Sequence, residues 1–184
     1  MAIFALAIAA NAQGLVVGSM IENFSLPDLN GNVQTLNRLK GQKGAVVIFL
    51  SAGCPMVKVY KDRINQIAAE AQAKGINFIG INSNSTEKLN WVKTNATGFG
   101  YRFPILIDRG AVLARALNVE ATPEVYLIDG QNQLLYHGAI DNDRAGTHIT
   151  ASYLTAAIDA SLIGRQLVKV SVAPFGCSVK RVGL

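Results

Sequence analysis

Residues 45–50 read A-V-V-I-F-L, and residues 51–55 continue the chain as S-A-G-C-P. A continuous apolar run of this length is typical of a strand that is buried on both faces of a sheet. Pro55 follows a short turn and suits the first position of a helix, where the missing backbone N–H costs nothing. The stretch therefore predicts a strand, a turn and a helix, with Cys54 at the mouth of that helix.

The helix that begins at Pro55 has one apolar face. Its apolar residues recur at spacings of three and four, at Val57, Tyr60, Ile64, Ile67, Ala68 and Ala71. Gly75 suits the position just after the last turn, where glycine readily adopts a left-handed conformation. We therefore expect a long amphipathic helix that ends near Lys74.

Strands and helices alternate along the rest of the chain. The expected elements are a strand over residues 76–81, a helix over 86–96 capped within 83–85, an extended piece over 104–107, a helix from 108 to 117, a strand over 125–128, its hairpin partner over 134–137, and a helix over 150–163. This order predicts an α/β fold whose sheet has an antiparallel edge supplied by the hairpin. Residues 168–184 follow as a tail without helical periodicity.

The composition is that of one globular domain. The chain has 184 residues, of which 50% are hydrophobic and 16% charged, so it can bury a core of ordinary size. The net charge is +5, but the basic residues are spread along the chain, which argues against nucleic acid as a partner. Two cysteines without a C-x-x-C motif and two histidines argue against a structural zinc site. We expect neither a metal nor a cofactor.

The first twelve residues differ from the rest of the chain. They read M-A-I-F-A-L-A-I-A-A-N-A, an apolar stretch too short to span a bilayer, and they end in an A-x-A cleavage pattern. No Lys or Arg precedes the apolar run. We interpret residues 1–12 as a signal peptide, which predicts a periplasmic or secreted protein; the alternative is a terminal strand or helix that packs on a cytoplasmic domain. No other stretch is long and apolar enough to span a membrane.

Cys54 is the strongest candidate for chemistry. The backbone N–H groups at a helix N-terminus and the helix dipole favour an anion, so this position stabilises a thiolate and makes it a better nucleophile. Lys58, one turn further on, adds positive potential. The alternative is a buried and inert cysteine, which is a common fate of free cysteines.

Three segments resemble the thioredoxin-like redoxins, the group that spans thioredoxins and AhpC/TSA-type peroxiredoxins. They are residues 18–31, G-S-M-I-E-N-F-S-L-P-D-L-N-G, the strand that leads to A-G-C-P, and residues 121–130, A-T-P-E-V-Y-L-I-D-G. The resemblance covers residues 18–167 and implies a thioredoxin fold, with a central mixed sheet flanked by helices and an irregular C-terminal tail. It also implies that Pro123 is a cis-proline beside the thiol, which lets the Thr122 backbone pair with an incoming substrate chain.

The chain departs from both branches of this group. Val57 stands where a thioredoxin has its second cysteine, and Ile48 where it has a buried acid. In the peroxiredoxin pattern P-x-x-x-T-x-x-C, Ser51 matches the hydroxyl position but Val47 occupies the proline position. The activating arginine of the peroxiredoxins is not evident either. These differences count against peroxide reduction and against a local disulfide at Cys54.

The tail offers a distant partner for Cys54. Residues 174–180, P-F-G-C-S-V-K, resemble the C-terminal P-F-G-C-S-[IV]-K segment of a bacterial subgroup of redoxins whose first cysteine is also followed by proline. The resemblance implies that Cys177 folds back to Cys54, either as a resolving cysteine or in a structural disulfide.

Three functions remain open at this stage. The first is a thiol–disulfide oxidoreductase with Cys54 as nucleophile and Cys177 as resolving cysteine, acting on a protein disulfide with an unidentified thiol reductant. The second is a thiol peroxidase, favoured by Ser51, in which Cys54 becomes a sulfenic acid that condenses with Cys177. The third is a non-catalytic binding domain held by a structural disulfide.

Other polar and aromatic residues carry smaller expectations. Glu124 follows the expected cis-proline and is a candidate for a proton acceptor near Cys54. The segment G-A-I-D-N-D-R predicts a loop held by an Asp–Arg pair among Asp141, Asp143 and Arg144. We expect Trp91 to pack against the domain, His137 to end a strand and His148 to lie on the surface.

Overall fold

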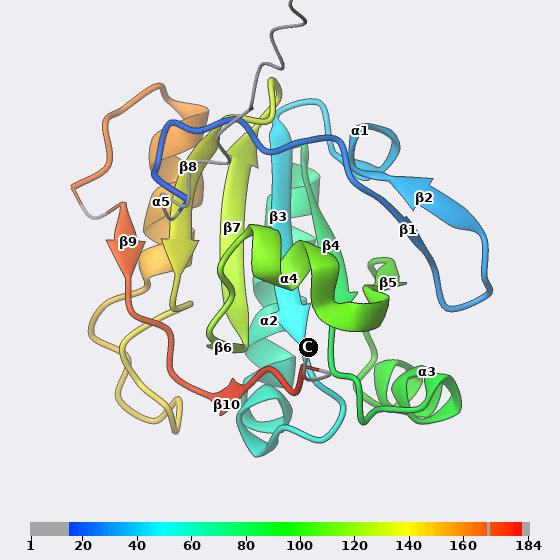
Figure 1. Cartoon of the computed structure of the whole chain (residues 1–184). Coiled ribbons are helices and arrows are strands. Elements are labelled where there is room, and N and C mark those ends of the chain that lie inside the picture. Colours follow the sequence, from blue (N-terminus) through cyan, green and yellow to red (C-terminus); the bar gives the residue numbers. More distant parts are fainter. Residues whose placement is uncertain (1–14, 169, 182–184) are drawn as a thin grey trace, which may run out of the picture.

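A computed structural model describes residues 15–168 and 170–181. The expected signal peptide, residues 1–12, lies outside the described residues. Within them, a six-stranded sheet is covered by helices on both faces (Figure 1). No helix of the described residues is both long and apolar enough to pass through a bilayer.

The central sheet is mixed, as predicted. Its strands are arranged in the order β5 (Ile105–Ile107), β4 (Ile76–Asn82), β3 (Gly44–Leu50), β7 (Glu124–Asp129), β8 (Leu134–Gly138) and β9 (Ser171–Val172). The first three are mutually parallel, and β7 runs antiparallel to both β3 and β8. The predicted hairpin of β7 and β8 therefore extends the sheet beyond β3, and the tail strand β9 adds a further, parallel edge.

Strand β3 divides the core into two layers. All seven of its residues are buried, which confirms a strand covered on both faces. Val46, Ile48 and Leu50 pack in the layer of α2 (Pro55–Ala73), α3 (Leu89–Gly98) and α5 (Tyr153–Leu162). Ala45, Val47 and Phe49 pack in the opposite layer, with α4 (Val112–Ala116) and α1 (Leu36–Leu39). Alternate side chains of one apolar run thus serve both halves of the core.

Two expected helices differ from the structure at their starts. The helix expected over residues 86–96 begins only at Leu89, because Ser83 and Ser85 bond elsewhere: Ser83 donates to Asp108 and Ser85 to the carbonyl of Lys180. The helix expected over residues 150–163 begins at Tyr153.

Asp108 does act as an N-terminal cap, as predicted. Its carboxylate accepts the N–H groups of Leu113 and Ala114 at 3.1 and 3.0 Å. The expected single helix is nevertheless divided into a 3₁₀ turn (Arg109–Ala111) and α4, because Gly110 and Ala111 have positive φ angles.

The tail is more ordered than expected. Besides β9, it forms β10 (Cys177–Ser178), which pairs antiparallel with β6 (Ala121–Thr122) just before Pro123. The prediction of an irregular tail is therefore wrong in this respect, since strands of two residues carry no periodicity that a sequence can reveal. A further hairpin of β1 (Ser25–Pro27) and β2 (Val33–Thr35) precedes β3. In Figure 1 the tail runs past β6 toward the end of β3, where α2 begins.

Candidate functional site

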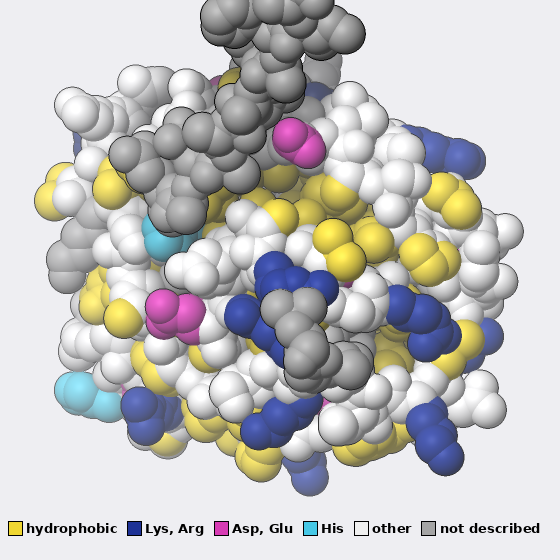
Figure 2. Space-filling model, in the orientation of Figure 1, with side chains coloured by type: hydrophobic (Ala, Val, Ile, Leu, Met, Phe, Trp, Pro, Cys, Tyr) yellow, Lys and Arg dark blue, Asp and Glu magenta, His cyan; other side chains and the backbone are white. Residues whose placement is uncertain are grey.

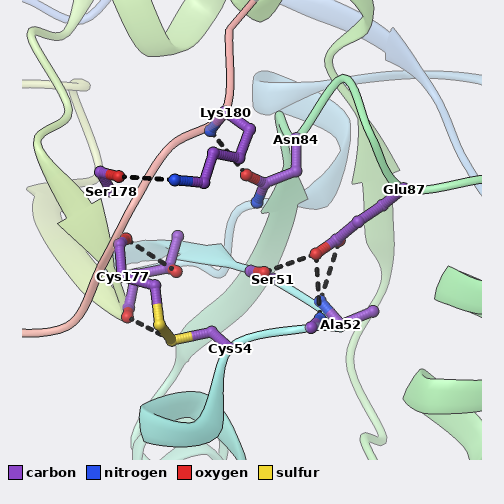
Figure 3. Close-up of a disulfide and its surroundings, with 10 residues drawn as sticks. Ser51, Ala52, Cys54, Asn84, Glu87, Cys177, Ser178 and Lys180 are labelled. Carbon is purple, nitrogen blue, oxygen red and sulfur yellow. Dashed lines mark hydrogen bonds between the residues drawn. A yellow bond between two sulfur atoms is a disulfide. The ribbon is translucent and has the colours of Figure 1, made fainter.

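Cys54 lies where the sequence places it, as the N-cap residue of α2 with Pro55 in the first turn. Its backbone is extended and its side chain is only 3% exposed. Cys54 forms a disulfide with Cys177, and their Cα atoms are 5.8 Å apart (Figure 3). The pairing that the resemblance implied is therefore present, and it ties the tail to the N-terminus of α2.

Thr122 contacts both cysteines. The bond between Thr122 and Pro123 is cis, as the resemblance implied. In the register of β6 and β10, Thr122 lies opposite Cys177, and the Thr122 hydroxyl donates to the Cys177 carbonyl at 3.3 Å. The Thr122 carbonyl oxygen lies 3.2 Å from Cys54 Sγ. In the reduced protein this oxygen is placed to accept a hydrogen bond from the Cys54 thiol.

Ser51 and the turn before Cys54 are held by a carboxylate that sequence reasoning missed. The Ser51 hydroxyl donates to Glu87 Oε1 at 2.5 Å, and the N–H groups of Ala52 and Gly53 each donate to the same carboxylate at 2.9 Å (Figure 3). Asn82 Nδ2 adds a fourth hydrogen bond at 2.6 Å. Glu87 therefore fixes the turn and places a negative charge beside Cys54. Nothing in the sequence signals this role, because an acidic residue near the start of an expected helix is ordinary.

Glu124 does not face Cys54. One of its carboxylate oxygens accepts the N–H groups of Glu120 and Ala121 at 2.8 and 3.1 Å, and the other accepts the Tyr126 hydroxyl at 2.8 Å. The expected proton acceptor is therefore a support for the segment that leads into β6. Burial, followed by the charge of Glu124, raises the pKa of Tyr126 above its usual range.

The expected Asp–Arg pair exists with a different arginine. Asp141 is buried and pairs with Arg63 of α2 at 2.6 Å, and it also accepts the Tyr60 hydroxyl at 2.7 Å. Burial, followed by the hydrogen bond to Asp141, raises the pKa of Tyr60. The guanidinium of Arg144 lies instead over the ring of Phe175, 5.2 Å from its centroid. Sequence spacing could not show that α2 supplies the partner.

The other residues that the sequence singled out are exposed or partly exposed. Lys58 is exposed on α2, and His148 is exposed in the loop after β8. His137, at the end of β8, stacks on Tyr126 with ring centroids 5.7 Å apart. Trp91 is half exposed, but its ring covers the turn before Cys54. The contact is close, since a Cβ atom built on Gly53 would lie 2.9 Å from the Trp91 ring.

Several polar contacts hold the end of the tail beside the disulfide. The Lys180 N–H donates to Asn84 Oδ1 at 2.7 Å (Figure 3). The Lys180 carbonyl accepts both the N–H and the hydroxyl of Ser85 at 2.8 Å. Arg181 donates to the carbonyl of Val119. Lys and Arg side chains are scattered over this part of the surface, which fits the net charge of +5 (Figure 2).

The arrangement can carry out thiol–disulfide exchange. Of the five residues proposed from the sequence, Cys54, Cys177, Thr122 and Pro123 meet at one point, and Ser51 lies in the adjoining turn. Among the described residues, no group of three or more His, Cys, Asp and Glu side chains is placed to hold a metal ion.

Comparisons with known proteins agree with this fold. Thiol-disulfide oxidoreductase ResA from Bacillus thuringiensis (strain Al Hakam) is 26% identical over 126 residues, which are 68% of this chain and 71% of the relative. A hypothetical protein from Sinorhizobium meliloti 1021 has a crystal structure with a TM-score of 0.85 and 31% identity, over 94% of this chain and 98% of that one. A candidate thiol:disulfide interchange protein DsbE from Chlorobium tepidum shares the fold, with a TM-score of 0.66 and 21% identity over 81% of this chain and 99% of that one. The profile of the AhpC/TSA family matches residues 17–137, and the chain belongs to this family.

Proposed function

We propose that the protein is a thiol–disulfide oxidoreductase in which Cys54 is the nucleophile and Cys177 the resolving cysteine. The observation that carries this proposal is the disulfide between Cys54, at the N-terminus of α2, and Cys177, which is paired with the strand before Pro123. The similarity to ResA, a thiol-disulfide oxidoreductase, supports it.

The proposed reaction proceeds in two exchange steps. The Cys54 thiolate attacks one sulfur of a partner disulfide, and the other partner sulfur leaves as a thiolate with the electron pair of the broken bond. The Cys177 thiolate then attacks Cys54 Sγ, forms the Cys54–Cys177 bond and releases the second partner sulfur as a thiolate. The partner disulfide has gained two electrons, the protein dithiol has lost them, and a dithiol reductant returns the protein to its starting state.

The peroxidase alternative has less support. It would use the Ser51 hydroxyl at the site, but this hydroxyl donates to Glu87. The negative charge of Glu87 beside this turn opposes a Cys54 thiolate in both mechanisms, so it does not distinguish them. Peroxide consumption by the reduced protein distinguishes this alternative from the proposed function.

A redox titration tests the proposal against a structural disulfide. The full chain is equilibrated with dithiothreitol or glutathione buffers, and the free thiols are counted after trapping. We expect a reduction potential in the catalytic range of about −120 to −270 mV; a value below about −300 mV would mean a structural disulfide. With a protein disulfide such as insulin, Cys177→Ser should form a stable mixed disulfide but should not turn over. Cys54→Ser should form no mixed disulfide and should not turn over either.

We also propose that the protein works in an oxidising compartment, where a disulfide of this kind persists. The expected signal peptide at residues 1–12 supports export. Mass measurement of the protein purified from periplasmic and cytoplasmic fractions tests this: removal of residues 1–12 in the periplasmic fraction is the expected result, and an intact cytoplasmic chain would contradict it.

A further inference from the structure

The tail sits on the protein as an added strand. Strand β10 pairs antiparallel with β6, Cys177 opposite Thr122 and Ser178 opposite Ala121, and these two strands form a sheet of their own. If β10 leaves, β6 becomes an edge with unpaired backbone groups beside Cys54. Such an edge can accept an extended segment of another chain through main-chain hydrogen bonds.

The residues that precede Cys177 lie in a site formed by Tyr60, Arg144 and Thr122, which we call the seat. Phe175 packs against the ring of Tyr60, with centroids 6.1 Å apart, and the guanidinium of Arg144 lies over the Phe175 ring, 5.2 Å from its centroid. Gly176 passes so close to Thr122 that a Cβ atom on it would lie 2.0 Å from the Thr122 carbonyl oxygen. The seat therefore fits an aromatic residue, then glycine, then cysteine, in that order.

We propose that, once the Cys54–Cys177 bond is reduced, β6 and this seat bind an extended segment of a partner protein with the order aromatic–glycine–cysteine, its cysteine being part of the partner's disulfide. The tail occupies this place in the oxidised protein and competes for it in the reduced protein. This inference rests on the proposed oxidoreductase function and adds to it the sequence of the segment that is recognised.

The shared seat couples resolution to release. The partner cysteine must lie at the position of Cys177 for its sulfur to bond with Cys54. For Cys177 to attack Cys54 in turn, β10 has to return to β6, which displaces the partner segment. The same movement thus forms the Cys54–Cys177 bond and removes the main-chain contacts that held the partner, whose sulfur leaves as a thiolate.

The attachment of the tail suits a reversible competitor. Its base is held at β9, which pairs with β8, so the tail stays close to its seat after reduction. Beyond Cys177, the contacts of the described residues are the pairing of Ser178 with Ala121, the packing of half-buried Val179 against the core, and hydrogen bonds made by Lys180 and Arg181. These contacts are individually small, and a partner segment can replace them.

Peptide binding to the full chain tests the proposal. The probe is a fluorescent peptide with the sequence of residues 173–180 in which serine replaces the cysteine, so that it can bind but not react. A matched peptide carries alanine in place of the glycine. By fluorescence anisotropy, the reduced wild-type protein should bind the glycine peptide at least about tenfold more tightly than the alanine peptide, and the oxidised wild-type protein should bind neither.

The same substitution in the protein should act in the opposite sense. In a Cys177→Ser background, Gly176→Ala weakens the seating of the protein's own tail, so the glycine peptide should bind about tenfold more tightly than to Cys177→Ser alone. Equal binding of the two peptides, or equal binding to oxidised and reduced protein, would overturn the inference. Because the probe lacks a cysteine, insulin reduction without selective peptide binding would refute this inference alone. Selective binding by a protein that does not exchange disulfides would support the strand site and refute the proposed function.

Discussion

The tail meets the body of the protein twice, at β9 and at β10, and the two attachments differ in kind. Strand β9 extends the central sheet: the N–H groups of His137 and Ala139 donate to the carbonyls of Val170 and Val172 at 3.2 and 3.0 Å. Strand β10 lies outside that sheet and is joined to α2 by the disulfide. The first attachment depends only on hydrogen bonds and packing, whereas the second depends on the redox state. One tail can therefore be both anchored and releasable.

The largest expected effect is that of reducing the disulfide, which should release the attachment at β10 and leave the attachment at β9 in place. The disulfide closes a loop of 123 residues, so its loss should lower the free energy of unfolding by up to about 5 kcal/mol in the chain-entropy view. Urea unfolding with and without reductant measures this value.

Hydrogen exchange then locates the change. The amides of Ser85 and Lys180, which bond across the end of the tail, should exchange at least about a hundredfold faster after reduction. The amide of Ala139, which bonds to β9, should keep its protection. Equal loss at both places would mean that the tail detaches as a whole and that the comparison is wrong.

A substitution at Gly138 should disturb the β9 attachment in both redox states. Gly138 has a φ of +121°, and a Cβ atom there would lie 1.8 Å from the Val172 carbonyl oxygen. Gly138→Ala should therefore lower the free energy of unfolding by about 2–4 kcal/mol, equally in oxidised and reduced protein. Gly98→Ala is the matched control, since nothing lies within 4 Å of that position, and it should leave stability nearly unchanged.

The equivalent change at β10 should act more strongly on the oxidised state than on the reduced state. Gly176→Ala places a Cβ atom against the Thr122 carbonyl oxygen, but only while β10 is seated. We expect the oxidised protein to lose about 1.5–3 kcal/mol more than the reduced protein does, and the reduction potential to rise by about 30–60 mV. A redox titration beside wild type measures the shift. If the reduction potential stayed constant while both redox states lost equal free energy of unfolding, β10 would stay paired with β6 after reduction, as β9 stays paired with β8.

The sequence predicted the two attachments to different degrees. The run over residues 45–50, the amphipathic face of α2 and the hairpin of β7 and β8 are local patterns, and the structure confirms them. Strands β9 and β10 have two residues each, so only their partners define them. The pairing of Cys54 with Cys177 followed from a family resemblance, because two cysteines 123 residues apart carry no local signal.

Glu87 shows why part of the site was invisible in the sequence. Its four hydrogen-bond donors come from the turn after β3 and from the end of β4, which meet only because these two strands are neighbours in the sheet. The expected helix over residues 86–96 placed Glu87 in a first turn, where an acidic residue needs no other explanation. Long-range contacts of this kind are set by topology rather than by spacing along the chain.

The smallest predicted effect concerns Glu87, which supports the turn before Cys54 and has no counterpart at β9. Each of its two carboxylate oxygens accepts two donors, so Glu87→Gln turns an NH₂ group toward two of them. The loss of these hydrogen bonds should lower stability by about 1–2 kcal/mol in both redox states. The loss of the negative charge favours the thiolate, so the alkylation of Cys54 by iodoacetamide in the reduced Cys177→Ser protein should become several-fold faster at neutral pH. Glu70→Gln, on the exposed side of α2, is the control and should change neither value. An unchanged alkylation rate with lowered stability would restrict Glu87 to holding the turn, and the reactivity of Cys54 would then be set by α2 and Thr122.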